Sequence, residues 1–443
     1  MQPGPKFTTL RIRDLSDLIT KGDVSPSEIA GDVVRCASEI RGSNCWQHFD
    51  PDDVLGQGRR QTTEAIDGDA SRLRGIPVSV KDLFDVAAQP TTCGSRFFGA
   101  GEPGPENDAA FVRLWREHGA LLAGKTHLNE FAYGITGENP WFGDCTIPGR
   151  PDRLTGGSSS GAAASVSGGA ACIGLGTDTG GSLRVPAALC GLVSFRSRDW
   201  FPDHRGTFPL ARSFDTLGWL NRHLDDVGFV AAALFGDAMK PSVGSTFPTL
   251  VFPEGPLLEG CDTDIVSALK AFRELLREVG APVVSCAADG WEEALDLFAP
   301  VQANEAFAVH RSRFRSDPDQ YSPAVRARLQ WGAQITEAEV AGLHERIGRL
   351  VSRMAGAFEE GPLLVVPAAS VSCLRSGDDH GATRSRLLRL TTPASLGCWP
   401  VLTIPWRPAG EATGVGFQII ARREDEHRLV AFAGLLAARA GCF

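Results

Sequence analysis

The residues of this sequence best suited to chemistry are two serines and a lysine. Ser158 lies in the glycine-rich stretch 155–161 (TGGSSSG), and Ser182 lies in a second one, 176–184 (GTDTGGSLR). Glycines beside a serine let the backbone approach a substrate closely and adopt angles that other residues resist. Lys81 stands well upstream, at the end of a short apolar run. The pattern predicts a serine hydrolase site in which a lysine, rather than a histidine, is the ultimate base.

Lys81 is the candidate base because a serine hydroxyl is a weak nucleophile until its proton is removed. None of the nine histidines lies in a motif that marks a triad partner. A lysine can act as a base when it is neutral, and burial beside apolar strands lowers its pKa. The run 76–80 (IPVSV), which precedes Lys81, predicts such surroundings.

The segment just before Ser182 predicts an oxyanion hole. Thr179, Gly180 and Gly181 offer consecutive backbone N–H groups, two of them without a side chain. Such a nest can hold the negative charge that develops on a carbonyl oxygen under attack.

Short strands and helices alternate along the chain and would position these residues. A capping box at 25–28 predicts a helix through residue 40. Apolar runs predict buried strands, and helical spacing predicts further helices. The predicted strands are 75–80, 120–124, 172–176, 363–367, 401–405 and 414–420, and the predicted helices are 110–119, 161–171 and 427–439. Longer helical patterns fill 255–350. The alternation predicts an α/β fold around a mixed sheet.

Composition excludes several other classes of protein. The 443 residues are 43% hydrophobic and 22% charged, with a net charge of −9. That balance is typical of a soluble globular protein and argues against a nucleic-acid binder. No stretch approaches the roughly 18–20 apolar residues that span a bilayer, and residues 1–6 contain no apolar leader. The expectation is a cytoplasmic protein that does not interact with membranes or nucleic acids.

The eleven cysteines are scattered and contain no CxxC pair. This usage favours a reducing compartment over a disulfide framework. Because their spacing matches no metal motif, we predict no metal, and we predict no cofactor.

Seven pieces of the sequence, in order, resemble the amidase signature family. They are 77–82 (PVSVKD), 129–134 (NEFAYG), 138–139 (EN), 156–161 (GGSSSG), 176–187 (GTDTGGSLRVPA), 213–218 (SFDTLG) and 392–396 (TPASL). The resemblance extends from about residue 8 to 440. It implies a large twisted mixed β-sheet sandwiched by α-helices. It also implies a single domain over 1–443, with a motif-bearing core at about 70–222 and 360–443 and a more variable helical region at about 255–350.

The resemblance also implies a Lys–Ser–Ser triad. Ser182 would be the nucleophile and Lys81 the base. Ser158, following a cis Gly157–Ser158 peptide bond, would bridge them. Catalysis would proceed through an acyl-enzyme on Ser182.

The chain departs from the family pattern at 196–201 (RSRDWF), where a proline and a glycine are usual, and at Cys398 and Trp399. The sequence leaves the effect of the altered 196–201 turn open. We predict structural roles for Asp178, Arg184, Glu138, Asn139 and His310. The candidate substrate contacts are Tyr133, Gly134, Trp141, Ser159, Trp331 and Trp399; for each tryptophan, ordinary core packing is the competing interpretation.

The predicted function is hydrolysis of a small carboxamide or ureido compound, with release of ammonia or an amine. The pieces look most similar to the branch that contains indole-acetamide hydrolases and allophanate-type hydrolases. One alternative is the glutaminase (A-type) subunit of a tRNA-dependent amidotransferase, which needs partner chains. Another is a non-catalytic amidase-like binding module. The sequence leaves open whether the chain forms a homodimer.

Overall fold

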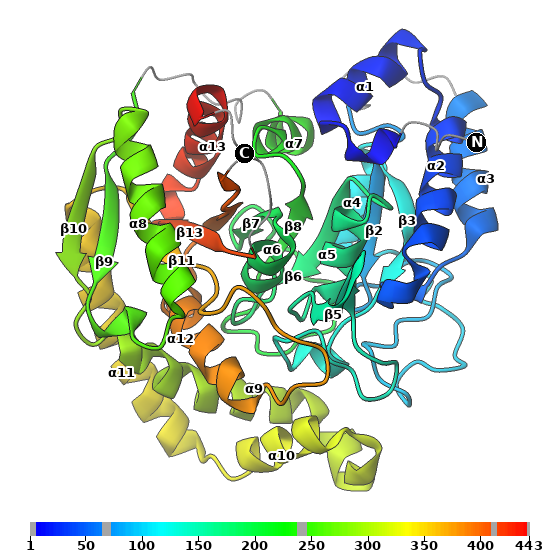
Figure 1. Ribbon diagram of the computed structural model, residues 1–443. Coiled ribbons are helices and arrows are strands. Elements are labelled where there is room, and N and C mark those ends of the chain that lie inside the picture. Colours follow the sequence, from blue (N-terminus) through cyan, green and yellow to red (C-terminus); the bar gives the residue numbers. More distant parts are fainter. Residues whose placement is uncertain (1–5, 64–71, 237–245, 409–413, 441–443) are drawn as a thin grey trace.

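One mixed sheet runs through the molecule (Figure 1). The structure is a computed structural model that describes residues 6–63, 72–236, 246–408 and 414–440. Its sheet has eleven strands in the order β1-β3-β2-β6-β8-β7-β12-β13-β11-β9-β10. The triplets β3-β2-β6 and β11-β9-β10 are parallel, and the strands between them pair antiparallel. The predicted α/β class, with a large mixed sheet between helices, is confirmed.

The strands of the large sheet are short. They are β1 (Trp46–His48), β2 (Pro77–Lys81), β3 (Leu121–Thr126), β6 (Ile173–Thr177), β7 (Val193–Ser197), β8 (Leu217–Asn221), β9 (Leu250–Glu254), β10 (Val283–Ala287), β11 (Leu363–Pro367), β12 (Val401–Pro405) and β13 (Gly416–Ala421). A separate hairpin pairs β4 (Thr146–Ile147) with β5 (Arg150–Leu154). Because β7 pairs with β12, strands from both motif-bearing segments share the large sheet. The single-domain assignment itself stays a prediction.

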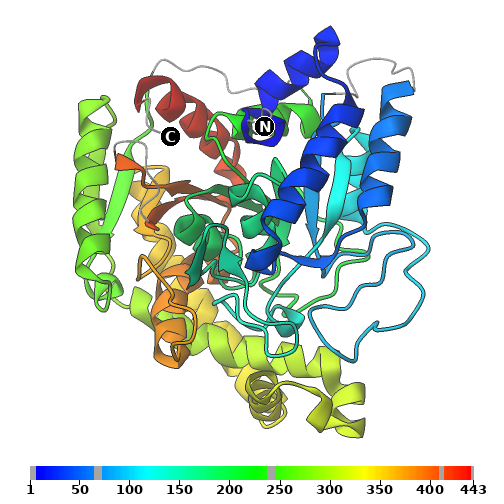
Figure 2. The same cartoon turned by 45° about the vertical axis from the view of Figure 1, so that its right-hand side comes forward.

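Helices cover both faces of the sheet. They are α1 (Ile12–Lys21), α2 (Pro26–Glu39), α3 (Pro51–Thr63), α4 (Ala110–Glu117), α5 (Ser160–Ser167), α6 (Arg184–Cys190), α7 (Asp226–Phe235), α8 (Thr263–Glu278), α9 (Ala294–Ser316), α10 (Pro323–Gly332), α11 (Glu337–Ala355), α12 (Gly381–Leu396) and α13 (His427–Ala440). Figure 2 shows α2 and α3 side by side at one edge, where they pack closely.

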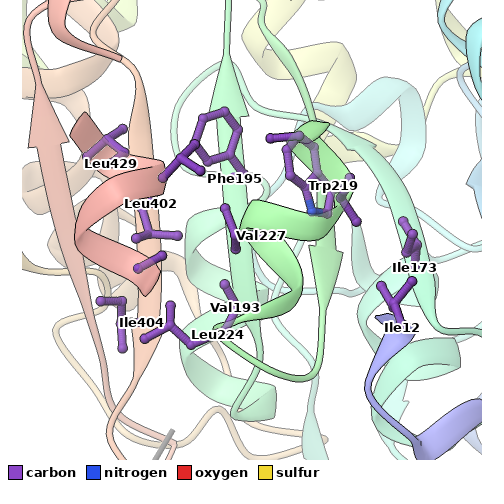
Figure 3. Close-up of a cluster of buried hydrophobic side chains, with 14 of the residues drawn as sticks. Ile12, Ile173, Val193, Phe195, Trp219, Leu224, Val227, Leu402, Ile404 and Leu429 are labelled. Carbon is purple, nitrogen blue, oxygen red and sulfur yellow. The ribbon is translucent and has the colours of Figure 1, made fainter. Parts of the chain in front are cut away.

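The alternation of strand side chains produces two apolar layers. Trp219 points into the layer formed with α1, α4, α7, α8 and α13, whereas the next residue, Leu220, packs against α5 and α6 on the other face. Figure 3 shows part of the first layer, in which Phe195 stacks on Trp219 with ring centroids 4.8 Å apart. Each large apolar side chain buried there contributes about 1.5–3 kcal/mol.

The structure confirms most of the predicted elements. The capping box at the start of α2 is formed, since the Ser25 hydroxyl accepts from the Glu28 N–H and the Glu28 side chain accepts from the Ser25 N–H. The helix predicted over 161–171 ends earlier, at Ser167, because two glycines follow and Gly169 has a φ of +76°. The helical region at 255–350 contains α8 to α11 and the strand β10.

The sheet explains why the lysine and the second serine stretch meet. Strands β2 and β6 are adjacent and parallel, with Val80 opposite Leu175. Their carboxyl ends therefore lie at the same edge of the sheet. That edge presents Lys81 beside Thr177 and the loop that leads to Ser182.

Candidate active site

Lys81 is the last residue of β2 and is completely buried. Burial lowers its pKa to about 7, and the carboxylates of Asp178 and Asp215 oppose this decrease. A lysine with such a pKa is substantially neutral at neutral pH and can accept a proton. The environment that the apolar run predicted for Lys81 is present.

Three hydroxyl groups surround the amine of Lys81. Its Nζ lies 2.8 Å from the Oγ of Ser158, 3.2 Å from the Oγ of Ser159 and 2.8 Å from the Oγ1 of Thr177. The Ser159 hydroxyl donates its own proton to the Thr177 carbonyl oxygen at 3.2 Å, so Ser159 accepts from the lysine. The Ser158 hydroxyl has no other acceptor among the described residues. Its proton is therefore the one available for transfer.

The two serine loops are joined directly. Ser158 lies between β5 and α5, and the Gly157–Ser158 peptide bond is cis, as the family resemblance implied. Ser182 lies between β6 and α6 and is 5% exposed. The backbone N–H of Ser159 donates to the carbonyl oxygen of Ser182 at 3.2 Å. This bond holds the Ser158 turn against the loop that contains Ser182.

Asp178 shapes the loop that contains Ser182. Its carboxylate accepts from the N–H groups of Gly181 at 2.9 Å and Leu183 at 3.0 Å. Arg184 binds the same carboxylate through Nη2 at 2.7 Å and Nε at 3.0 Å, and Arg196 approaches it at 3.4 Å. Burial alone would raise the pKa of Asp178, but the two guanidinium groups hold it well below its usual value. Asp178 and Arg184 therefore have the structural roles that the sequence predicted.

Replacing Arg184 should destabilise the fold strongly. Besides Asp178, its guanidinium donates to the Gln418 side chain at 2.7 Å and to the Ser395 hydroxyl at 2.9 Å, and all of these groups are buried. Removing one partner of a buried ion pair costs about 3–5 kcal/mol, so we expect that decrease in the free energy of unfolding of Arg184→Met in urea titrations. Arg205→Met, which breaks an exposed pair with Asp203, should leave the urea midpoint unchanged. Equal midpoints for the two variants would contradict this account.

The backbone N–H groups around Ser182 correct one detail of the predicted oxyanion hole. The Gly181 N–H is engaged by Asp178 and is not free to bind a substrate. Within the described residues, the N–H groups of Thr179, Gly180 and Ser182 have no protein acceptor. The sequence could not distinguish these donors, because nothing in the glycine pattern shows which N–H the aspartate takes.

The side chains around Gly180 and Gly181 leave little room for a Cβ atom at either position. A Cβ atom on Gly180 would lie 3.0 Å from Phe298 and 3.1 Å from Leu388. Gly181 has a φ of +122°, and its Cβ would lie 2.9 Å from Thr391. The hydroxyl of Thr391 also donates to the Gly180 carbonyl oxygen at 2.5 Å. The loop is thus fixed against α12.

A cavity of about 440 Å³ is lined by two of the predicted contacts, Tyr133 and Gly134. Ile135 lines it as well, and its carbonyl oxygen accepts from the Gly157 N–H at 2.9 Å. A second cavity, of about 350 Å³, reaches Thr177 and Thr179 from another side and is lined by Asp215. Thr179 donates its hydroxyl proton to Asp215 at 2.6 Å.

The three tryptophans do not line either cavity. Trp331 is 43% exposed on α10. Trp399 is buried against Phe358, at 5.1 Å between ring centroids. The indole N–H of Trp141 donates to Glu130 at 2.7 Å. In the structure Trp399 packs against Phe358 and Trp141 bonds to Glu130. The predicted contact of the three tryptophans with substrate stays a prediction.

The remaining sequence predictions concern loops and packing. The Asn139 amide donates to the carbonyl oxygens of Gly94 and Leu128, which ties two loops together. Glu138 accepts from Thr136 at 2.6 Å. His310 is buried against the Phe131 ring, at 4.4 Å between centroids. All three have the structural roles that were predicted.

The altered 196–201 segment begins on a strand that the sequence did not predict. Arg196 lies on β7 and is fully buried. Its Nε donates to the Thr216 hydroxyl at 2.9 Å, and its Nη1 donates to the Trp399 carbonyl oxygen at 3.0 Å. Arg196 also lies 3.4 Å from the Asp178 carboxylate, so this segment helps to hold Asp178 in place. The signal that could have found it is the apolar run that precedes Arg196.

Comparisons with known proteins agree with this geometry. The sequence profile of the Amidase family matches residues 33–430. The 2-amino-5-chloromuconic acid deaminase of Comamonas testosteroni is 31% identical, over 86% of this chain and 83% of its own. The A-type chain of the glutamyl-tRNA(Gln) amidotransferase of Akkermansia muciniphila is 28% identical, over 92% and 95%. A solved amidase structure is 29% identical and superimposes with a TM-score of 0.87, over 97% of this chain and all of the other.

The described residues contain neither a metal-type cluster nor a membrane-spanning helix. No group of three or more histidine, cysteine, aspartate or glutamate side chains there has an arrangement suited to a metal ion. None of the helices within those ranges is both long and apolar enough to cross a membrane.

Proposed function

This chain belongs to the Amidase family and is a hydrolase of amide C–N bonds, and we propose that it cleaves a small carboxamide or ureido compound through an acyl-enzyme on Ser182. The observation that carries the proposal is the fully buried Lys81, whose Nζ lies 2.8 Å from the Ser158 hydroxyl. The backbone bond from the Ser159 N–H to the Ser182 carbonyl oxygen supports Ser182 as the nucleophile, because it joins the Ser182 loop to the Ser158 turn.

Acylation begins with two coupled proton transfers. Neutral Lys81 takes the proton of Ser158 while Ser158 takes that of Ser182. The Ser182 oxygen attacks the substrate carbonyl carbon and forms a tetrahedral intermediate. When the C–N bond breaks, the lysine proton returns through Ser158 to the leaving nitrogen. Water, activated by the same pair, then attacks the ester and releases the acid.

The oxyanion of the intermediate would be held by backbone donors. The N–H groups of Thr179, Gly180 and Ser182 are the candidates, since the N–H of Gly181 is taken by Asp178. Fixed donors of this kind need no reorganisation during the reaction, and losing one costs about 3–4 kcal/mol in barrier height. The contact of α12 with Gly180 keeps them in place.

Activity should rise with pH through about 7 and level off above it. Lys81, whose pKa is about 7, is protonated below that value and cannot accept a proton; above it the neutral base predominates. The measurement is kcat/KM against pH from about 5 to 10 with a substrate that does not titrate. Asp215, whose pKa burial raises to about 6, is the competing group. Asp215→Asn should keep the rise near 7, and a profile that is flat below about pH 6 would count against lysine as the base.

The first test of function is ammonia release by the purified chain over an amide panel, with Ser182→Ala beside it. The panel holds indole-3-acetamide and other aryl amides, malonamate, allophanate, ureas, glutamine and aliphatic amides. The Comamonas relative is named for an acid as its substrate, so amides of acids belong in the panel too. A substrate that is lost with Ser182→Ala supports the proposal. Equal activity of the variant and the parent would support the binding-module alternative.

A glutaminase subunit is the second candidate, and the amidotransferase relatives favour it. They match nearly the full length of this chain at 26–28% identity. In that case glutamine would be the ammonia source, and release would require partner chains. Glutamine turnover that appears only with partner subunits would support this candidate; turnover of another amide by the isolated chain would contradict it.

A further inference from the structure

Two arginines line the 440 Å³ cavity without a carboxylate partner. Arg328 comes from α10 and Arg384 from α12, and both are half-buried. Within the described residues, no carboxylate oxygen lies within ion-pair distance of either guanidinium. The Nε of Arg384 is buried and has no hydrogen-bond partner in that part of the chain. Like charges in a half-buried space are unfavourable unless an anion joins them.

None of the cavity's own acidic groups lies within ion-pair distance of the two guanidinium groups, although the charge of Glu138 acts on Arg328 from farther away. Glu130 accepts from the Trp141 indole and the Ser322 N–H. Glu138, Asp144 and Asp379 accept from Thr136, the Asn139 N–H and the Gly381 N–H, in that order. Burial, and then the charge of Arg328, lower the pKa of Arg384 to about 10. The two guanidinium groups therefore act on each other electrostatically across the cavity.

Two contacts connect the surroundings of the cavity to the serine loops. On α12, Arg384 precedes Leu388 by one turn, and Leu388 packs against Gly180 of the Ser182 loop. One helical turn rises about 5.4 Å. Ile135, which also lines the cavity, accepts from the N–H of Gly157, which adjoins Ser158. The cavity is thus connected through its neighbours to both serine loops.

Tyr133 completes the pocket. Its carbonyl oxygen accepts from Arg328, and its ring lies under that guanidinium, 5.3 Å from ring centroid to Cζ. These two contacts orient Arg328 where it lines the cavity. A planar guanidinium matches the two oxygens of a carboxylate, which is why arginine binds this group bidentately.

We propose that the acyl part of the substrate carries a carboxylate, which Arg328 and Arg384 bind together in this cavity. The substrate is then the monoamide of a short dicarboxylic acid or its ureido equivalent. This inference rests on the proposed function, because it assigns the acyl side of the same reaction. It gives Arg328 and Arg384 a role in specificity rather than in bond cleavage.

The kinetic test compares succinamate with succinamide, which differ in the charged group alone. The parent enzyme should prefer succinamate. Charged hydrogen bonds of this kind are worth roughly a 10- to 100-fold effect, so Arg384→Gln and Arg328→Gln should lose that factor in kcat/KM for succinamate, mainly through KM. Hydrolysis of succinamide should not change. Arg326→Gln, a partly exposed residue of α10 paired with Asp319, is the matched control and should behave as the parent.

A binding test separates this inference from the proposed function. Titration calorimetry of Ser182→Ala with succinate should give saturable binding. Adding Arg384→Gln to this variant should weaken the affinity for succinate at least about tenfold, and adding Arg384→Lys instead should restore part of it. If succinate binds no better than succinamide, or if all variants bind succinate equally, the inference is overturned even when amides are hydrolysed. Succinate binding by the arginines without hydrolysis of any amide upholds the pocket and overturns the proposed reaction.

Discussion

Replacing Ser182 with alanine should reduce kcat/KM for the best amide by about 10⁶-fold, the loss seen when a catalytic serine is removed. The loss is large because the proposed mechanism makes the Ser182 oxygen the nucleophile, and the methyl group of alanine cannot attack a carbonyl carbon. The fold should not change, since the Ser182 hydroxyl has no hydrogen bond within those residues and its side chain fills little space. Ammonia release by the variant and the parent under identical conditions measures the loss of activity, and their melting temperatures show whether the fold has changed.

Ser167→Ala is the matched control for this change. Ser167 is the last residue of α5, and within the described chain its hydroxyl bonds only to the Ala164 carbonyl oxygen, so its variant should keep full activity. Mass spectrometry of the quenched reaction should find the acyl group on the peptide that contains Ser182. An acyl group on Ser158 or Ser159 instead would reassign the nucleophile, and a Ser182→Ala variant with parental rates would remove covalent catalysis at this position.

The sequence predicted the parts of this site that depend on local order along the chain. An apolar run followed by Lys81 must bury the lysine if the run is an inner strand, and β2 is one. Glycines around Ser158 and Ser182 predicted two tight turns, and both are present. Parallel pairing of β2 and β6 then brings the carboxyl ends of these two strands together. The alternation of strands and helices along the sequence already favours parallel pairing.

The parts that the sequence did not predict depend on contacts between distant segments. The family pattern places Arg196 in an altered turn. In the structure it lies on the inner strand β7, and its guanidinium is 3.4 Å from the Asp178 carboxylate. Strands β7 and β8 escape prediction because each mixes polar and apolar residues, unlike the equally short apolar run of β11. The role of the Gly181 N–H is equally hidden in the sequence, since only the folded loop shows that Asp178 turns back to accept it.

The tryptophans show the limit of residue type as a guide. Trp141, Trp331 and Trp399 are candidates because large aromatic side chains often line substrate pockets. The structure gives the pocket wall to Tyr133 and to arginines that the sequence analysis did not single out. Nothing local distinguishes Arg328 from Arg326 on α10, although one faces a cavity and the other an exposed aspartate.

The charges around the triad explain how a neutral lysine can coexist with a nearby carboxylate. Asp178 alone would draw a proton onto Lys81 and raise its pKa. Arg184 and Arg196 oppose that charge, because both bind the same carboxylate in the buried interior. Burial can then dominate, and the pKa of Lys81 falls to about 7. Arg184 and Arg196 therefore act on the pKa of Lys81 through Asp178.

Replacing Lys81 tests the base directly, and the choice of side chain decides what is learned. Lys81→Met keeps the length of the side chain and removes the amine, so kcat/KM should fall by about 10²–10⁴-fold, the usual contribution of a general base. Lys81→Arg retains a positive charge and hydrogen-bond donors but cannot accept a proton at any working pH.

If Lys81 merely organises the three hydroxyls around it, Lys81→Arg should recover much of the activity that Lys81→Met loses. If it is the base, both variants should be equally slow, and both should lose the rise of kcat/KM near pH 7. We expect the second pattern, because the Ser158 hydroxyl has no other acceptor among the described residues and its proton needs a neutral nitrogen to receive it. Residual activity that returns at high pH in Lys81→Met would then report hydroxide taking the proton in place of the amine.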